Sequence, residues 1–239
     1  MIKFNISSIE TFGLLDGPGI RVVLFLQGCN LRCKFCHNPE TWSTKENNIY
    51  ELEQLVKFIL KYKDYFKNNG GVTLSGGEPL LQTNNLILLC QKLKENNINI
   101  ALDTAGIGVG NIEKLLNYID LILFSIKGLD DLEYKEIAKA SKEKSDDFLT
   151  LCIKKQKKIW LRHVIIPNYN DTFEYIDLFY NYIKDIPNVD KIELLPYHNM
   201  ANKKYIELNL ENKMVNTNNM SITKCKDLEV YLNEKIVKN

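Results

Sequence analysis

Two kinds of apolar segment alternate along this 239-residue chain. Short runs rich in β-branched and aromatic residues stop at a glycine or a polar residue, and longer segments follow in which apolar residues recur at helical intervals. The short runs predict β-strands at residues 20–28, 71–75, 98–104, 120–128, 158–167 and 191–198. The longer segments predict helices at residues 49–69, 84–97, 111–119, 129–157, 172–186 and 224–237. The pattern therefore indicates six consecutive βα units.

These units favour one α/β domain over residues 1–239, because no Pro/Gly/Ser-rich linker and no low-complexity tract interrupts them. Residues capable of chemistry follow every predicted strand, from cysteines after the first strand to His198 after the sixth. The C-terminal ends of parallel strands are where the sites of such folds lie. An open doubly wound sheet would concentrate its site between a few strands. The sequence therefore predicts a partial (β/α)6 barrel of parallel strands with one mouth.

Composition and charge exclude several classes of function. The net charge of +1 provides no basic field for nucleic acid and no acidic tail. The opening sequence MIKFNISSIETFGLL lacks the apolar core and cleavage site of a signal peptide, and no apolar run approaches the length of a membrane span. We therefore expect a cytoplasmic monomer that binds neither nucleic acid nor membranes.

Three of the six cysteines lie within eight residues of the segment QGCNLRCKFCHNPETW. Cys29, Cys33 and Cys36 have the spacing C-x3-C-x2-C, and no fourth cysteine follows nearby. Cys90 and Cys152 lie in segments with helical apolar spacing, which predicts small core residues. The sixth cysteine opens the last helical segment and has no visible partner. Six cysteines are too few for a disulfide framework in a chain of this size.

The clustered cysteines suit either zinc or an iron–sulfur cluster. Structural zinc sites take four ligands, and His37 follows Cys36 so directly that it would complete a tetrahedron only awkwardly. A 4Fe–4S cluster held by three cysteines leaves one iron with an open position, where a substrate can bind. The residues alone do not decide between a zinc site and an iron–sulfur cluster.

The cysteine motif, with aromatic Phe35 before its last cysteine, resembles that of radical S-adenosylmethionine enzymes. The longer segment DGPGIRVVLFLQGCNLRCKFCHNPETW is similar to the N-terminal signature of the enzymes that activate glycyl radical enzymes. SGGEPLLQ, LDT, WLRHVIIP and IELLPYH follow in the order of that family, so the resemblance covers nearly the whole chain. It is strongest to the group that activates pyruvate formate-lyase.

The resemblance implies two cofactors and a protein substrate. One 4Fe–4S cluster would bind the amino and carboxylate groups of S-adenosyl-L-methionine at its open iron. One electron, from flavodoxin or ferredoxin, would cleave the S–C5′ bond and yield methionine and a 5′-deoxyadenosyl radical. That radical would take a hydrogen atom from a backbone glycine of the partner enzyme. The cofactors perform the difficult chemistry, and the protein supplies position and water exclusion.

Roles for individual residues follow from the same resemblance. The three clustered cysteines would bind iron, and Phe35 would pack on adenine beside the main chain of Cys36 and His37. Gly76 and Gly77 would let the backbone approach the methionine moiety closely, because glycine has no Cβ.

Further cofactor contacts are implied at the ends of later strands. Lys127 would pair with the methionine carboxylate, and His198 would hydrogen-bond to the adenosyl part. Arg162 has three open roles: touching the cofactor, positioning the glycine loop, or pairing with an internal carboxylate. The remaining implied members of the pocket are Glu78, which supports the GGEP turn, and Ser125 and Ile126 beside the lysine.

Two positions depart from the family pattern. The activating group usually carries Asp-x-Lys at the end of the fourth strand, where this chain has Ser125. That aspartate would complete a monovalent-cation site with Asp103 and Thr104, so the implied site lacks one carboxylate. Ala201 also stands where the family prefers glycine.

Elimination favours pyruvate formate-lyase as the partner. Activating enzymes of several other glycyl radical enzymes carry a cysteine-rich ferredoxin-like insert, but residues 37–75 contain no cysteine. The activating enzymes of anaerobic ribonucleotide reductase also lack this insert, but they are much shorter than this chain.

Three alternatives remain open. The first is an activating enzyme for another glycyl radical enzyme. The second is a radical S-adenosylmethionine enzyme acting on a small molecule or peptide, against which the segment LPYHNMANKKYIELNL argues because it extends the resemblance. The third is a zinc-stabilised binding protein without catalytic activity.

Overall fold

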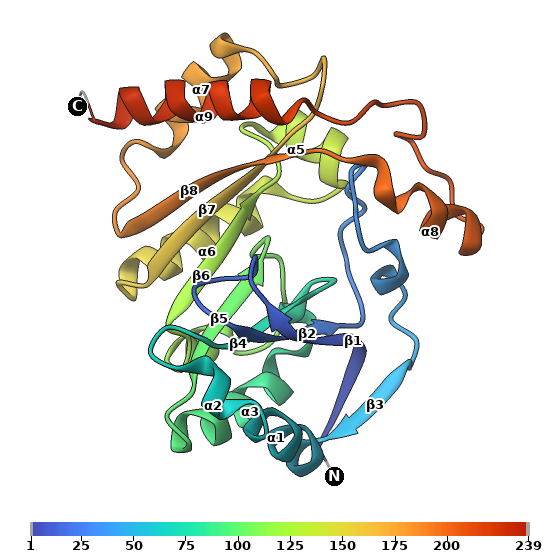
Figure 1. The fold of residues 1–239 in the computed structure, drawn as a ribbon, viewed down its shortest axis with the longest axis vertical. Coiled ribbons are helices and arrows are strands. Elements are labelled where there is room, and N and C mark those ends of the chain that lie inside the picture. Colours follow the sequence, from blue (N-terminus) through green and yellow to red (C-terminus); the bar gives the residue numbers. More distant parts are fainter. Residues whose placement is uncertain (1, 238–239) are drawn as a thin grey trace.

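A curved sheet of eight strands organises residues 2–237, the part of the chain that the computed structural model describes (Figure 1). Its strands stand in the order β3-β1-β2-β4-β5-β6-β7-β8. From β2 to β8 neighbouring strands are parallel, whereas β1 runs antiparallel to both β2 and β3. The strand bounds are β1 Lys3–Gly13, β2 Arg21–Leu26, β3 Asn48–Glu51, β4 Gly71–Gly76, β5 Asn99–Thr104, β6 Leu121–Ile126, β7 Lys158–Ile165 and β8 Val189–Pro196.

Apart from α1 and α2, which follow the edge strand β3, the helices follow the parallel strands of the predicted βα units. Most of them lie on the outer side of the curved sheet, whereas α8 lies beside the loop that follows β2 (Figure 1). The α-helices are α1 Leu52–Leu60, α2 Lys63–Phe66, α3 Thr83–Glu95, α4 Ile112–Leu116, α5 Asp131–Ala138, α6 Lys142–Lys154, α7 Phe173–Ile183, α8 Asn202–Glu207 and α9 Ile222–Val237. Three short 3-10 turns cover Pro39–Trp42, Pro79–Gln82 and Asn199–Ala201.

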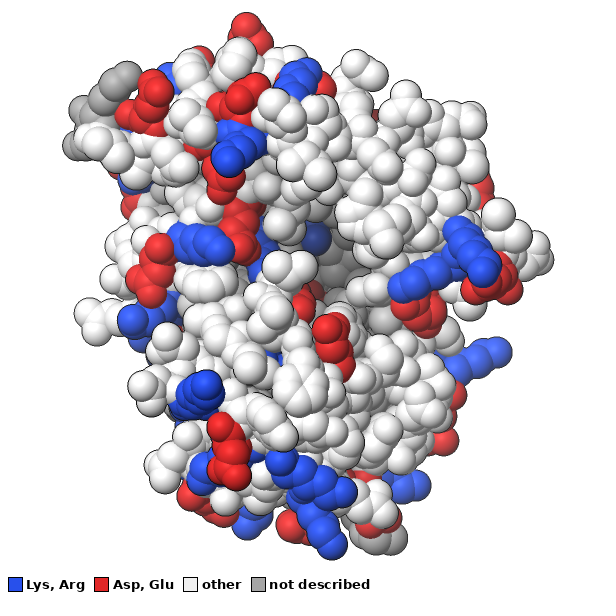
Figure 2. Space-filling model, viewed as in Figure 1, with Lys and Arg blue, Asp and Glu red and all other residues white. Residues whose placement is uncertain are grey.

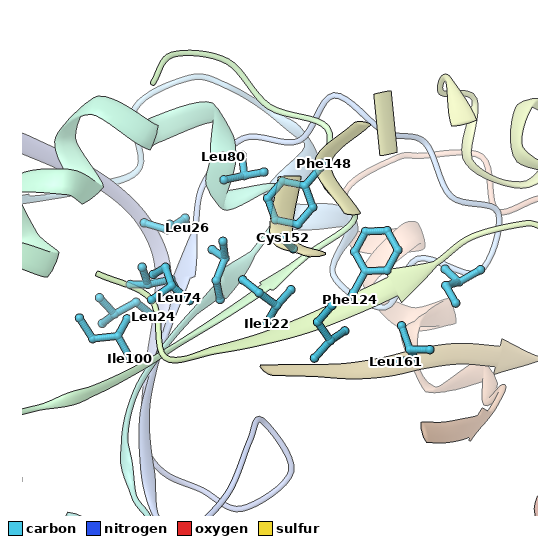
Figure 3. Close-up of a cluster of buried hydrophobic side chains, with 14 of the residues drawn as sticks. Leu24, Leu26, Leu74, Leu80, Ile100, Ile122, Phe124, Phe148, Cys152 and Leu161 are labelled. Atoms are coloured by element: carbon cyan, nitrogen blue, oxygen red, sulfur yellow. The ribbon is translucent and has the colours of Figure 1, made fainter. Parts of the chain in front are cut away.

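The core runs from strand to strand beneath these helices. Leu24 on β2 is level with Leu74 on β4, and Phe124 on β6 is level with Leu161 on β7 (Figure 3). Phe148 of α6 stacks on Phe124 with ring centroids 6.0 Å apart. Each of these side chains is at most 3% exposed, and burial of one such side chain stabilises the fold by about 1.5–3 kcal/mol.

The two predicted core cysteines are confirmed, and Cys225, to which the sequence assigned no role, is buried as well. Cys90 on α3 and Cys152 on α6 are fully buried, and Cys225 on α9 is 4% exposed. Among residues 2–237, every cysteine is a free thiol. None of the helices in this range combines the length and apolar character that crossing a bilayer requires.

The predicted partial barrel of parallel strands is confirmed, with an antiparallel extension that was not predicted. β1 was missed because its buried and exposed residues alternate, so it lacks the continuous apolar run of the inner strands. The helix predicted at 49–69 is wrong at both ends. Asn48–Glu51 pairs with β1 as strand β3, and the helical part divides into α1 and α2 after Leu60.

Candidate active site

A cavity of about 300 Å³ lies at the C-terminal ends of the parallel strands. The face shown in Figure 2 is hollowed near its centre. All six strands from β2 to β8 in the parallel set contribute to the cavity, directly or through the loops that follow them. It brings together these residues singled out from the sequence: Cys29, Cys33, Phe35, Cys36, His37, Gly76, Gly77, Glu78, Asp103, Thr104, Ser125, Lys127, Arg162 and His198. The prediction that residues following all six strands share one site at the C-terminal strand ends is therefore confirmed.

The cysteine loop that follows β2 is held from both sides. The Arg32 and Lys34 backbone N–H groups donate to the carbonyls of Ala138 and Ile137, each at 2.8 Å, at the end of α5. On the other side, the Tyr205 hydroxyl of α8 donates to the Cys36 carbonyl at 3.1 Å. The loop is therefore fixed to two elements that lie more than a hundred residues further along the chain.

The three thiols form one wall of the cavity. Burial raises the pKa of Cys29 to about 12 and that of Cys36 to about 11, and it also raises the pKa of Cys33. The charge of Cys33 raises the pKa of both other thiols further. Thiolates in this position need a compensating cation, and a bound metal deprotonates its cysteine ligands.

Two N–H groups already point at these sulfurs. The Leu31 backbone N–H donates to Cys29 Sγ at 3.4 Å, and the Trp42 indole N–H donates to Cys36 Sγ at 3.2 Å. Hydrogen bonds of this kind stabilise the charge on cluster sulfurs. Within residues 2–237, no group of three or more His, Cys, Asp or Glu side chains is arranged to hold a metal ion. The donor set of three soft sulfurs with N–H partners fits a 4Fe–4S cluster, which spaces its ligands more widely than one ion does.

Aromatic and cationic side chains line the neighbouring wall. The His37 and His198 rings meet edge to face with centroids 3.9 Å apart. Burial lowers the pKa of His37 to about 4, with His198 and Lys204 contributing, so its imidazole is neutral at pH 7. The Lys127 ammonium lies 5.4 Å from the centroid of the Phe35 ring. These groups offer a flat apolar surface and one positive charge, which suit a ligand that carries both an adenosyl group and a carboxylate.

The GGEP turn needs its glycines for packing within the chain. Gly76 has φ +114°, and a Cβ there would lie 2.2 Å from the Leu26 nitrogen. A Cβ on Gly77 would lie 2.1 Å from the Gly28 carbonyl oxygen. Both glycines thus let the end of β4 lie directly against the start of the cysteine loop, a reason that the sequence did not disclose.

Glu78 supports this turn, as predicted. It is 1% exposed, and its carboxylate accepts hydrogen bonds from the Leu80 N–H at 3.1 Å and the Ala105 N–H at 3.0 Å. The Thr104 hydroxyl donates to it at 2.5 Å. Burial raises the pKa of Glu78 to about 7, and the three donated bonds limit that rise. The carboxylate therefore ties the end of β5 to the GGEP turn.

Arg162 pairs with internal carboxylates, the third of its open roles. Its Nε donates to Glu193 at 2.7 Å, and its guanidinium lies 3.7 Å from Asp103. It also donates to the Leu15 carbonyl, which ties the loop after β1 to β7. Burial raises the pKa of Asp16 in that loop to about 6, and Asp103 raises it further.

Two oxygens of the implied cation site, Asp103 Oδ2 and the Thr104 hydroxyl, are already engaged. Asp103 accepts from the Ser75 hydroxyl at 2.9 Å and faces Arg162. The Thr104 hydroxyl donates to Glu78 and accepts from the Gly106 N–H at 2.8 Å. With Ser125 in place of a carboxylate, the residues present do not fit a monovalent cation.

One implied cofactor residue does not reach the cavity. Ser125 and Lys127 face the cavity, and Ile126 between them points to the core, where it is 3% exposed. Side chains alternate along a strand, so the Ile126 side chain packs in the core, and a contact of its main chain with the cofactor stays a prediction. Its carbonyl is 2.9 Å from His163 Nδ1, and His163 packs on the opposite side of β7 from the cavity, as the alternation predicts.

Three residues that sequence reasoning missed hold the cysteine loop. Trp42 bonds to a cysteine sulfur and meets Tyr205 edge to face, with ring centroids 5.7 Å apart. Lys204 donates to Glu40 at 2.6 Å and to the His37 carbonyl at 3.1 Å. Trp42 stands within the quoted cysteine segment, but nothing in the local pattern of α8 indicates a partner so distant in sequence.

Comparisons with known proteins identify the family of the chain. The family of 4Fe-4S single cluster domains matches residues 15–147. A pyruvate formate-lyase-activating enzyme of Clostridium pasteurianum is 48% identical over 235 residues, which cover 98% of this chain and 99% of that protein. The chain belongs to the pyruvate formate-lyase-activating enzymes. A member of this family from Staphylococcus aureus strain USA300 is 38% identical and covers 88% of the chain, with 87% of its own length matched.

Solved structures support the same fold. Streptococcus suis SuiB bound to its precursor peptide SuiA superposes with a TM-score of 0.69 at 16% identity, over 96% of this chain and 47% of SuiB. This chain therefore spans about half of SuiB. A domain of a pyruvate-formate lyase-activating enzyme from Bacteroides vulgatus gives a TM-score of 0.56 at 20% identity, over 69% of this chain and 94% of that domain.

Proposed function

We propose that this protein installs a glycyl radical on pyruvate formate-lyase, using a 4Fe–4S cluster and S-adenosyl-L-methionine. One observation carries the proposal: three thiols, one buried and two half-buried, form one wall of a cavity whose other walls are the GGEP turn, Lys127 and two histidines. Close relatives along nearly the full chain are activating enzymes of this kind. When bound, cluster and cofactor supply the electron and the carbon-centred radical that removes hydrogen from glycine.

The residues of the cavity are suited to hold the cofactor in one orientation. Cys29, Cys33 and Cys36 would hold the cluster. In the described part of the chain Lys127 has no carboxylate within 4.0 Å, so its charge is available for the methionine carboxylate. The neutral His37 can pack against adenine without charge repulsion.

The polypeptide substrate would enter from the mouth of the partial barrel. The sheet is open at β8 and β3, so its lateral gap is wider than that of a closed eight-stranded barrel. A backbone glycine fits such a gap only as an extended loop that has left its own protein, which makes binding transient. We further propose that the protein acts as a cytoplasmic monomer of one domain, with flavodoxin or ferredoxin as electron donor.

An anaerobic activation assay tests this function. The reduced protein is mixed with S-adenosylmethionine and pyruvate formate-lyase from the same organism, and the electron paramagnetic resonance spectrum is recorded. We expect a glycyl doublet on the lyase together with lyase activity. Cofactor cleavage with a radical on a different glycyl radical enzyme, and none on the lyase, would reject the partner while retaining the chemistry.

A further inference from the structure

A second cavity, of about 350 Å³, adjoins the cysteine loop. It lies between the loop, the end of α5 and the segment after α8. Cys33 and Trp42 line both cavities, so the cysteine loop borders both. Nothing in the proposed chemistry of the cofactor cavity uses this second space.

The second cavity is strongly basic. Its walls carry Arg32, Lys34, Lys139 and Lys213 and one carboxylate, Glu211. Lys34 is already paired with Glu136 at 2.7 Å, so the excess of positive charge rests on Arg32, Lys139 and Lys213. Arg32, Lys139 and Lys213 are exposed to solvent. This concentration is unusual for a chain whose net charge is +1 and whose basic and acidic side chains are interspersed on the face shown in Figure 2. The excess of positive charge favours a negatively charged partner.

The basic walls are in direct contact with the cysteine ligands. The Arg32 guanidinium lies 5.1 Å from the centroid of the Trp42 ring, and Trp42 donates to the Cys36 sulfur. Arg32 also donates to the Cys29 carbonyl at 2.8 Å. Cys33 itself lines the cavity. A protein seated on this surface would therefore be separated from the thiols by a single layer of side chains.

The surface is held in shape by backbone contacts. The N–H groups of Arg32 and Lys34 donate to the last turn of α5. Lys139, directly after that turn, has φ +55° and its N–H donates to the Lys135 carbonyl, which ends the helix. A preformed surface of this kind can receive a partner with little rearrangement.

We propose that this basic cavity is the docking surface for an acidic one-electron carrier of the flavodoxin or ferredoxin type. The carrier is oxidised by one electron as the oxidised cluster is reduced by one, so the inference rests on the proposed function. Electron-transfer complexes are small and short-lived, commonly burying less than about 1,200 Å², so a few exposed basic side chains around the cavity can form much of such an interface.

A charge-reversed variant tests the docking surface. Lys139→Glu with Lys213→Glu is compared with Lys57→Glu and Lys61→Glu, which changes the net charge equally on and just after α1, remote from the cysteine loop. Formation of 5′-deoxyadenosine is followed with two donors: a reduced acidic flavodoxin, and photoreduced deazariboflavin, which is small and uncharged. We expect the cavity variant to be slowed about tenfold or more with flavodoxin at low salt, with the difference shrinking as salt is added.

With deazariboflavin the cavity variant should match the unmodified protein, and the α1 control should match it with both donors. A cavity variant that accepts electrons from flavodoxin at the unmodified rate would overturn the docking surface. Equal slowing with both donors would also overturn it, because the lysines would then act on the site itself. Binding of inorganic phosphate in the cavity with flavodoxin kinetics unchanged would identify an anion site instead. Absence of 5′-deoxyadenosine from the unmodified protein with either donor would reject the proposed function.

Discussion

The indole N–H of Trp42 donates a hydrogen bond to the sulfur of Cys36 across 3.2 Å. A donated N–H stabilises the negative charge that a cluster gains on reduction, so such bonds raise reduction potentials. We predict that Trp42→Phe, which keeps the ring and removes the donor, shifts the midpoint potential of the cluster to a more negative value. Potentiometric titration of the anaerobic protein measures the shift.

Trp160 provides the matched control, since it is the other tryptophan of the chain and packs on Lys191, with 4.7 Å between the ammonium and the ring centroid. Trp160→Phe should leave the potential where it is. An unchanged potential in Trp42→Phe would show that the bond to sulfur does not influence the cluster.

Position 78 should not tolerate even glutamine, which differs from glutamate only by an amide in place of the carboxylate. All three of its hydrogen bonds are donated to it, so glutamine would place an NH2 group against an N–H or hydroxyl donor in a buried position. We predict that Glu78→Gln lowers the free energy of unfolding by about 1–3 kcal/mol. Urea denaturation measures it, with the exposed Glu95→Gln as a control expected to change stability by less than about 0.5 kcal/mol. Equal midpoints for both variants would refute the role of Glu78.

The parallel part of the fold could be read from the sequence because its strands are buried on both faces. The run from Arg21 to Leu26 is buried at all positions except Phe25, which gives a continuous apolar signal. β1 and β3 lie at an edge of the sheet and carry a weaker, alternating signal. The local pattern could not distinguish the start of a helix from strand β3, because pairing with β1 decided it.

The site was predictable for a similar reason. Polar residues at the ends of parallel strands necessarily converge, which brought Cys29, Lys127 and His198 into one cavity. The supports of the cysteine loop were not predictable. Tyr205 and Lys204 reach it from a short helix whose position depends on the path of the chain after β8, and no periodicity encodes that path.

His163 should make stability depend on pH. Burial lowers its pKa from its ordinary 6.5 to about 4, helped by Lys127, although the Ile126 carbonyl opposes this. Below about pH 6.5 His163 binds a proton in the unfolded chain but stays neutral in the folded protein. The free energy of unfolding therefore falls as the pH falls. We predict that this group removes about 2 kcal/mol between about pH 7 and about pH 5.

His163→Asn isolates this contribution, because the amide does not titrate. Urea unfolding at both pH values should show a smaller loss of stability for the variant than for the unmodified protein. Identical losses would mean that the pKa of His163 is not depressed in the folded state.

Ser125 should make the protein indifferent to monovalent cations. Asp103 Oδ2 already faces Arg162 and accepts from Ser75, and position 125 supplies a hydroxyl in place of a second carboxylate, so the site offers little negative charge to potassium or sodium. We predict equal affinity for S-adenosylmethionine in potassium, sodium and choline buffers, measured by calorimetry, and no bound thallium(I) by thallium nuclear magnetic resonance. Ser125→Asp should acquire potassium dependence. A strong preference of the unmodified protein for potassium would contradict the assignment.

The central claim is that three thiols, and only these, hold the cluster that cleaves S-adenosylmethionine. The most direct measurement is the 5′-deoxyadenosine formed by dithionite-reduced, anaerobically purified protein, compared among the unmodified chain and its Cys29→Ala, Cys33→Ala, Cys36→Ala and Cys90→Ala variants. We predict product from the unmodified chain and from Cys90→Ala, and none from the other three. Loss of product in folded Cys90→Ala, or a colourless zinc-containing protein that forms no product, would contradict the account.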